Sequence, residues 1–220
     1  MSYRVYALSL LAFLFSWRIV VAQPGNPIKP DLAALVRSAG PNVPNRTLQP
    51  VSEKNGIHFD QKPNGGVVWL DGVSFGNGTI EFDLRGKDVL QQCFIGMAFH
   101  GVDDTTYDAV YFRPFNFKNA DPVRRSHAVQ YISHPVHTWE KLRKEQPDRF
   151  EQPINPAPDP KAWFHVRVVV QRPTVQVFVD GQQTPSLVVS KLNERTSGKL
   201  GLWVGPGLGG DFANLEIKKD

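Results

Sequence analysis

The sequence predicts an all-β fold, a two-sheet antiparallel sandwich or jelly roll with a short N-terminal helical lead-in and one long flap. Two observations carry this prediction. From about residue 48 onward, apolar and polar residues alternate in one segment after another, which is the period of strands with one buried face. Eighteen glycines and eighteen prolines separate these segments, as is typical of many short strands joined by turns.

The composition of the 220-residue chain fits a single globular domain with a sizeable core. Hydrophobic residues make up 41% and charged residues 21%, which excludes a disordered chain. The formal net charge is +4, but without Arg4 and Arg18 of the N-terminal segment 23 basic residues face 21 acidic ones. This small surplus argues against nucleic acid or an anionic membrane as the partner.

Residues 1–22 are predicted to be a signal peptide. They contain an apolar run over residues 5–17, and the small residues Val20 and Ala22 suit the −3 and −1 cleavage positions. The alternative is a membrane anchor, but the run is short for a membrane span and Arg18 interrupts it. We therefore expect cleavage near Ala22 and a secreted or periplasmic protein whose mature chain has no membrane span.

Residues 23–47 are predicted to be a lead-in or linker, and residues 48–220 the sandwich domain. The lead-in is rich in Pro, Asn and Gly and contains one helical stretch, DLAALVRSAG. In that stretch Asp31 is a suitable N-cap and Gly40 a suitable C-terminal stop.

The domain is predicted to contain about ten or more short strands. In TIEFDLR, for example, Ile80, Phe82 and Leu84 face one way, and in FANLEIK the alternation sets Ala213, Leu215 and Ile217 against Phe212, Asn214 and Glu216. The predicted strands are VVWL (67–70), TIEFDLR (79–85), CFIGMAFH (93–100), YDAVYFRPF (107–115), HAVQYIS (127–133), FHVRVVV (164–170), TVQVFVDG (174–181), LGLWVG (200–205) and FANLEIK (212–218).

The succession of GTIEFDLRG, FIGMAFHG, YDAVYFRPFNF, HAVQYIS, VRVVVQRPTVQVFVDG and GLWVGPGLGGDFANLEI resembles the concanavalin A-like lectin/glucanase superfamily. It is most similar to bacterial exported domains grouped with laminin-G-like and 3-keto-disaccharide-hydrolase-type jelly rolls. The resemblance covers roughly residues 50–219 and rests mainly on strands and turns. It implies a curved sandwich whose concave face and rim loops often hold carbohydrate.

Two neighbouring acids are candidate catalytic residues. Glu81 and Asp83 share one face of a strand, about 6.5–7 Å apart along it, which is compatible with the carboxyl pair of a glycosidase. Glucanases of the superfamily carry a third alternating acid, where this chain has Arg85. The alternative is a solvated outer face on which Asp83 pairs with Arg85.

A polar-aromatic face is the main candidate for ligand binding. Tyr111 and Arg113 share one face of their predicted strand, and His127 and Tyr131 share one face of the next. Such side chains would each need a buried partner in a core, whereas tyrosine rings stack on sugars and Arg and His donate to hydroxyls or a carboxylate. The alternative is a surface strand with ordinary cross-strand aromatic pairs.

The flap at residues 134–160 could close over that face. Its run WEKLRKE is compatible with a short helix after Thr138, and Trp139 and Arg143 are further candidate ligand-binding residues. Glu151 is a third candidate acid. The alternative is a solvated loop without function.

Metal and cofactor signals are weak. Asp103, Asp104 and Asp108 could bind calcium through their oxygens, but such clusters more often form turns. His134 and His137 lack a third ligand at zinc spacing. We therefore predict no cofactor, with calcium as the one candidate metal.

Three functions fit these observations. The first is an exported, lectin-like domain that binds carbohydrate on a polar-aromatic concave face. The second is a glycoside hydrolase that uses the candidate acids, and the third is a laminin-G-like protein-interaction module. The oligomeric state stays open.

Overall fold

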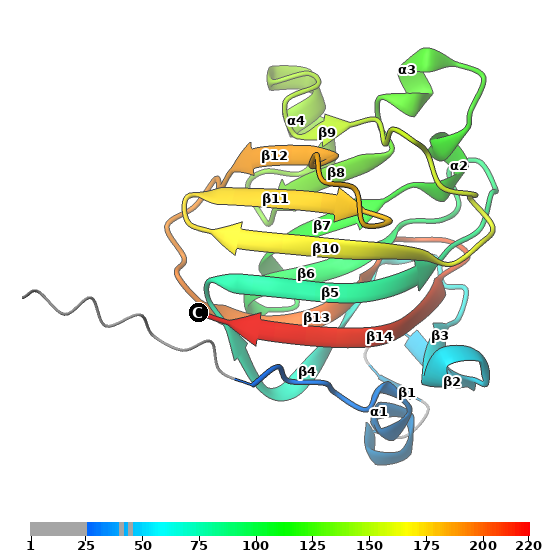
Figure 1. The fold of residues 1–220 in the computed structure, drawn as a ribbon, viewed down its shortest axis with the longest axis vertical. Coiled ribbons are helices and arrows are strands. Elements are labelled where there is room, and N and C mark those ends of the chain that lie inside the picture. The colour runs from blue at the N-terminus through cyan, green and yellow to red at the C-terminus, as the bar shows by residue number, and fades with distance from the viewer. Residues whose placement is uncertain (1–25, 40–41, 44–45) are drawn as a thin grey trace, which may run out of the picture.

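Two antiparallel sheets pack face to face in the computed structural model, which describes residues 26–39, 42–43 and 46–220 (Figure 1). The predicted two-sheet antiparallel sandwich is confirmed. The predicted leader, its cleavage position near Ala22 and the helix stop at Gly40 lie outside the described residues.

One sheet has eight strands, and β14 lies near its middle although it comes last in the chain. The strands in order across the sheet are β1 (Asn42–Val43), β2 (Arg46–Val51), β3 (Gly56–Phe59), β14 (Gly210–Lys219), β5 (Gly78–Arg85), β10 (Phe164–Gln171), β11 (Thr174–Val179) and β12 (Leu187–Ser190).

The second sheet has six strands and carries the pocket described below. In order across the sheet they are β4 (Gly66–Phe75), β13 (Gly198–Val204), β6 (Ile95–Asp103), β7 (Thr106–Phe112), β8 (Val129–Ser133) and β9 (Glu151–Gln152). Every predicted strand segment overlaps one of these or a strand of the first sheet. The segment over residues 107–115 is shorter than predicted, because Pro114 begins a helical turn.

Helical segments are short and lie around the sandwich. They are α1 (Leu32–Ala39), η1 (Glu53–Asn55), α2 (Pro114–Phe117), α3 (Pro122–Arg125) and α4 (Trp139–Glu145). The predicted N-cap Asp31 is present, since its carboxylate accepts a hydrogen bond from the Ala34 N–H at 3.1 Å. The structure adds a cap at Thr138, whose hydroxyl accepts a hydrogen bond from the Lys141 N–H at 3.4 Å.

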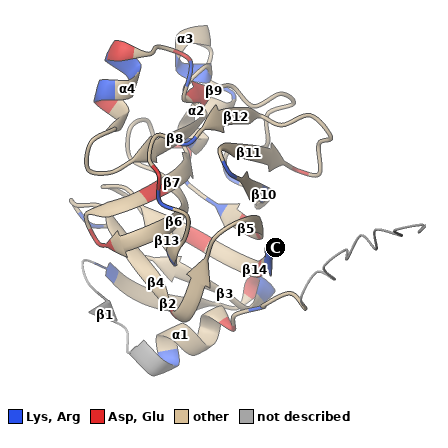
Figure 2. Ribbon diagram, turned by 90° about the vertical axis from the view of Figure 1, so that its left-hand side faces the viewer, with Lys and Arg blue, Asp and Glu red and all other residues tan. Residues whose placement is uncertain are grey.

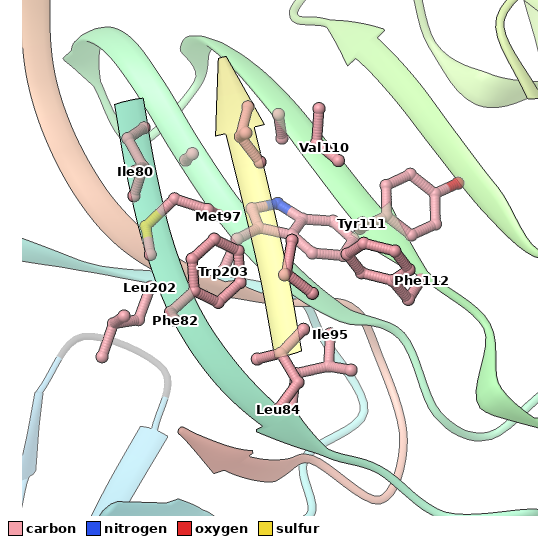
Figure 3. Close-up of a cluster of buried hydrophobic side chains, with 14 of the residues drawn as sticks. Ile80, Phe82, Leu84, Ile95, Met97, Val110, Tyr111, Phe112, Leu202 and Trp203 are labelled. Carbon is pink, nitrogen blue, oxygen red and sulfur yellow. The ribbon is translucent and has the colours of Figure 1, made fainter. Parts of the chain in front are cut away.

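The core lies between the two sheets. Ile80, Phe82 and Leu84 of β5 are fully buried on the predicted face, and Figure 3 shows them gathered with Met97 of β6 and Leu202 of β13. Burial of this apolar surface provides the main stabilisation of the sandwich.

Strand β14 departs from the predicted alternation. A bulge between Ala213 and Glu216 interrupts its pairing with β5, and Asn214 adopts a positive φ of 52° there. The extra residue shifts the register, so Phe212 is fully buried, with its ring centroid 4.9 Å from that of Phe59. The prediction that Phe212 faces away from Ile217 was therefore wrong, because the two pair with the core residues Leu84 and Ile80.

The lead-in packs on the sandwich. Ile28 and Ile217 exchange two backbone hydrogen bonds of 2.8 Å, and Leu32 of α1 is buried. Strand β2 begins two residues before the predicted domain boundary at residue 48. The described part of this segment is thus continuous with the sheet.

Among the described residues, no helix is long and apolar enough to cross a membrane.

Candidate functional site

A pocket of about 570 Å³ opens on the outer face of the six-stranded sheet. Its position follows from strand alternation: Phe112 of β7 packs against Phe164 of the opposite sheet, so the preceding Tyr111 points outward. Cross-strand register places Trp203 of β13 and Gly96 of β6 in the same row as Tyr111. The flap and the segment from α2 to α3 supply the remaining wall.

Aromatic rings form one side of this pocket. Trp203 and Tyr111 have ring centroids 4.7 Å apart, and the Trp203 indole N–H donates to the Tyr107 hydroxyl at 3.1 Å. The His134 ring stacks on Tyr107 at 5.1 Å with an interplanar angle of 16°. Trp139 of α4 is 41% exposed and completes the aromatic lining. These faces can stack on the apolar face of a ring-shaped ligand.

Hydrogen-bonding side chains form the other side. They are Arg113, Asn116, Arg124, His127 and Arg143. Burial lowers the pKa of His127, so its imidazole is neutral near pH 7. The Asn116 amide N–H donates to the His127 carbonyl at 3.2 Å, and its Oδ1 has no partner among the described residues. That oxygen is buried and belongs to a residue that borders the pocket.

Glu151 lies behind Arg113 and Arg143 and holds their guanidinium groups in place. Its carboxylate is 2% exposed and accepts two hydrogen bonds from Arg143, from Nε at 2.7 Å and from Nη2 at 2.6 Å. Arg113 Nη1 lies 3.5 Å from Glu151 Oε2, and His127 Nδ1 lies 3.0 Å from Oε1. These three side chains enclose Glu151, which is not among the residues that line the pocket. The candidate acid Glu151 thus lies behind the arginines and does not border the pocket.

Arg113 is held in a buried network. Its Nη2 donates to the Tyr111 hydroxyl at 2.6 Å and to Gln130 Oε1, and its Nη1 donates to the His127 carbonyl at 3.0 Å. The Tyr111 hydroxyl donates in turn to Gln130 Oε1 at 2.7 Å. Burial raises the pKa of Tyr111 to about 12, so its phenol stays protonated.

The rim opposite the flap is held by a buried arginine. Arg46 of β2 is 2% exposed and donates to the carbonyls of Gly205 at 2.7 Å and Asp60 at 3.2 Å, and also to that of Asn64. Gly205 borders the pocket. Arg46 thereby ties the loop after β13 to the loop before β4.

Five of the six predicted ligand-binding residues meet in the pocket: Tyr111, Arg113, His127, Trp139 and Arg143.

Tyr131 does not belong to the pocket. It pairs with Val110, is fully buried on the core side, and its hydroxyl donates to Asp108 Oδ1 at 2.9 Å. The prediction extended the alternation of β8 back to His127, but β8 begins at Val129 and His127 lies in the preceding turn.

The structure also adds residues that the sequence did not single out as ligand-binding. Trp203, His134 and Arg124 line the pocket. Alternation with the core residues Leu202 and Val204 places Trp203 on the outer face of its strand. Its contact with Tyr107 follows from the strand order β13-β6-β7, which no local pattern encodes.

A second cavity of about 320 Å³ adjoins the first. The two share Gly65, Tyr107 and His134, and the second is bordered further along by Asp104 and Thr105. Together they form a groove with the arginines at one end and Asp104 at the other.

Glu81 and Asp83 lie on the outer face of the eight-stranded sheet and do not line the pocket. They share a face as predicted, and His165 contacts both, Asp83 from Nδ1 at 2.8 Å and Glu81 from Nε2 at 3.4 Å. Arg85 pairs with Asp211 at 2.7 Å rather than with Asp83. The two acids are thus ion-paired on the sheet opposite the pocket.

The Asp83 network predicts a pH-dependent stability. Burial opposes ionisation of Asp83, but hydrogen bonds from His165, Lys54 and Asn214 lower its pKa from 3.8 to about 2. The hydrogen bond to Asp83 raises the pKa of His165 above 6.5. The contribution of Asp83 is lost as pH falls from about 4 towards 2, and that of His165 is lost as pH rises through its elevated pKa.

Asp83→Asn is therefore expected to lower the free energy of unfolding by about 2 kcal/mol between roughly pH 4 and 6.5, and by less on either side. Urea denaturation of both proteins across pH 3–9 measures this difference, with the exposed Asp88→Asn as control. A difference independent of pH would show that the ion pairs do not contribute.

The three candidate calcium ligands each have partners within the protein. Asp103 accepts hydrogen bonds from Thr105 within the β6–β7 turn, and Asp104 accepts one from the Trp69 indole at 2.7 Å. Asp108 lies in the interior between sheets and pairs with Lys191 at 2.6 Å. A cation therefore already neutralises it. The described residues contain no group of three or more His, Cys, Asp or Glu side chains placed to hold a metal ion.

Comparison with known proteins agrees with this fold. The sequence pattern of the 3-keto-alpha-glucoside-1,2-lyase-like domain matches residues 22–218. A protein of unknown function with a galectin-like fold from Bacillus subtilis superimposes with a TM-score of 0.58 at 10% identity, covering 90% of this chain and 97% of that one.

Two further solved structures are similar. Carbohydrate-binding module CBM66 from Bacillus subtilis has a TM-score of 0.54 at 15% identity, covering 80% of this chain and 92% of the module. The Emp46p carbohydrate recognition domain, in its metal-free form, has a TM-score of 0.52 at 12% identity, with coverage of 86% and 94%. Comparison with curated protein sequences gives no match. At these identities the likeness to the solved structures is one of fold.

Proposed function

This chain belongs to the 3-keto-alpha-glucoside-1,2-lyase-like domain family, and from that premise we propose that it binds carbohydrate in the pocket on its six-stranded sheet. The observation that carries the proposal is the pairing of aromatic rings with hydrogen-bonding side chains in one concave site. Trp139, Trp203 and Tyr107 supply the rings, while Asn116 and the arginines supply donors and an acceptor.

This arrangement suits the two kinds of surface that a sugar presents. The C–H face of a pyranose ring is apolar and stacks on aromatic rings, whereas its rim of hydroxyls both donates and accepts hydrogen bonds. The volume of about 570 Å³ lies within the range of small-ligand sites. The adjoining cavity beyond Tyr107 and His134 gives room for a second sugar unit.

The structural neighbours support the proposal. Two of them, CBM66 and the Emp46p domain, carry names that refer to carbohydrate binding or recognition. A two-carboxylate glycoside hydrolase has less support, because Glu81 and Asp83 lie on the other sheet and Glu151 is enclosed by arginines. The concave, arginine-rich lining also differs from the flat apolar surface that a protein-interaction module would use.

Trp139→Ala is expected to weaken saccharide binding by about tenfold, because it removes an exposed stacking ring worth roughly 1 kcal/mol or more. A saccharide panel scored by thermal shift identifies ligands, since a ligand at about 100 times its Kd adds roughly 2.7 kcal/mol to stability. Titration calorimetry then measures the affinity of the variant.

Trp163→Ala is the matched control, because Trp163 contacts Arg85 on the opposite sheet. Its affinity should equal that of the wild type. A folded protein that binds no member of the panel would refute the proposed function, and equal weakening by both variants would place the ligand elsewhere.

We also infer that the protein is exported and that its leader is removed after Ala22, as the composition of residues 1–22 indicates. Intact mass of the protein recovered from the medium or periplasm tests this inference. A mass that includes residues 1–22 would contradict it.

A further inference from the structure

The pocket has an uneven distribution of charge. Arg113, Arg124 and Arg143 all line it, together with His127 and His134, and no Asp or Glu is among the lining residues. Figure 2 marks Lys and Arg positions along the ribbon of both α3 and α4, the helices that carry Arg124 and Arg143. Outside residues 1–22 the chain has a surplus of only two positive charges, so this concentration is local.

Only part of this charge is neutralised by the protein. The single negative charge of Glu151 is shared between the positive charges of Arg143 and Arg113. Within the described chain, the one polar contact of the Arg124 side chain is with Asp121, at 3.7 Å, and Arg124 is 39% exposed. The Nη1 of Arg143 makes no hydrogen bond with the described residues. Guanidinium N–H groups of two arginines are therefore available to a ligand.

We propose that the end of the pocket between α3 and α4 binds the carboxylate of an acidic sugar, such as a uronic acid. This inference rests on the proposed carbohydrate function and specifies its ligand class. A carboxylate matches the planar fork of an arginine, and charge-assisted hydrogen bonds of this kind are stronger than those to a neutral hydroxyl. Trp139, whose ring lies 5.0 Å from the Arg143 guanidinium, would stack on the ring of the same sugar unit.

The two ends of the groove differ in charge, and this difference would orient the ligand. Asp104 borders the adjoining cavity, beyond Tyr107 and His134, and its carboxylate would repel an anionic group placed there. A neutral sugar unit fits this end, where Asp104 and Thr105 can interact with hydroxyls. The ligand is thus a chain of at least two units with its carboxylate at the arginine end.

The test compares matched neutral and uronate disaccharides of glucose, galactose and mannose by titration calorimetry on the mature chain. We expect one uronate disaccharide to bind at least roughly tenfold more tightly than its neutral counterpart. Arg124→Gln should remove most of that difference while Arg124→Lys retains part of it. Raising the salt concentration from about 0.05 M to about 0.5 M should weaken binding of the uronate only.

Arg125→Gln is the matched control, because Arg125 Nη1 donates to the Asn119 and Ala120 carbonyls and the residue does not line the pocket. Arg124 is preferred over Arg143 for the test, since removing Arg143 would leave Glu151 buried and less well paired.

The outcomes separate this inference from the proposed function. If neutral disaccharides bind as tightly as uronates and Trp139→Ala weakens both, the acidic-sugar inference fails while carbohydrate binding stands. If no disaccharide binds to the folded protein, both fail. If uronates are preferred but Arg124→Gln and Arg125→Gln behave alike, the anionic site lies elsewhere and the inference fails.

Discussion

Asp108→Asn is expected to lower the free energy of unfolding by about 3–5 kcal/mol, the largest effect of any single substitution considered for this protein. Asp108 is fully buried and accepts hydrogen bonds from Lys191 at 2.6 Å, Arg195 at 3.2 Å and Tyr131 at 2.9 Å. Removing its charge leaves two cations in the interior without their counterion.

The neighbouring histidine does not relieve this loss. His100 Nε2 lies 2.9 Å from the Gly76 carbonyl, an acceptor only, so Nε2 carries the ring proton. In that tautomer His100 Nδ1 accepts a hydrogen bond from Lys191 Nζ at 2.6 Å. Burial lowers the pKa of Lys191 and the Asp108 carboxylate opposes this shift, so Asp108 favours the charged form of Lys191.

Urea denaturation at neutral pH measures this effect, and the exposed Asp71→Asn provides a control that removes the same charge at the surface. The control should change stability by less than about 0.5 kcal/mol. If both variants had the same small effect, Lys191 would be neutral in the folded protein and Asp108 would not be its counterion.

Glu151→Gln is expected to destabilise the protein by about 2–3 kcal/mol and to weaken ligand binding at the same time. The carboxylate holds the Arg143 guanidinium through two hydrogen bonds, and Arg113 is itself 5% exposed. An amide accepts fewer hydrogen bonds and carries no charge, so both arginines lose their anchor. The loss is smaller than at Asp108 because Arg143 can reach solvent.

Denaturation and saccharide titration of the same variant test both parts of this prediction. Glu145→Gln, at the exposed end of α4, removes a carboxylate from the same flap without contact to the arginines and should leave both quantities unchanged. A Glu151→Gln protein with wild-type stability and affinity would show that the arginines are positioned without it.

The sequence was informative wherever structure depends on neighbours along the chain. Alternation located the strands and placed Tyr111 and Arg113 together, and the capping residue Asp31 marked the start of one helix. The strand beginning at Leu187 was missed, because only four residues alternate there. Short segments of this kind carry little periodic signal.

Errors arose where the backbone departs from a regular strand or where distant segments meet. Tyr131 was placed on the wrong face because the alternation was extended through a turn, and Phe212 because a bulge adds one residue. The burial of the candidate acid Glu151 beside two arginines could not be predicted, since nothing local shows that the flap folds back over it. Long-range ion pairing determines that role.

The place of β14 in the larger sheet has a consequence for biosynthesis. Its neighbours, β3 and β5, come from the first half of the chain, so the ribosome makes both long before the strand that joins them (Figure 1). Until residues 210–219 emerge, the edges of β3 and β5 that pair with β14 stay unpaired, and the two parts of the sheet are not joined. A nascent chain of this topology therefore remains incompletely folded during translation, the state in which a polypeptide can be threaded through a translocation channel.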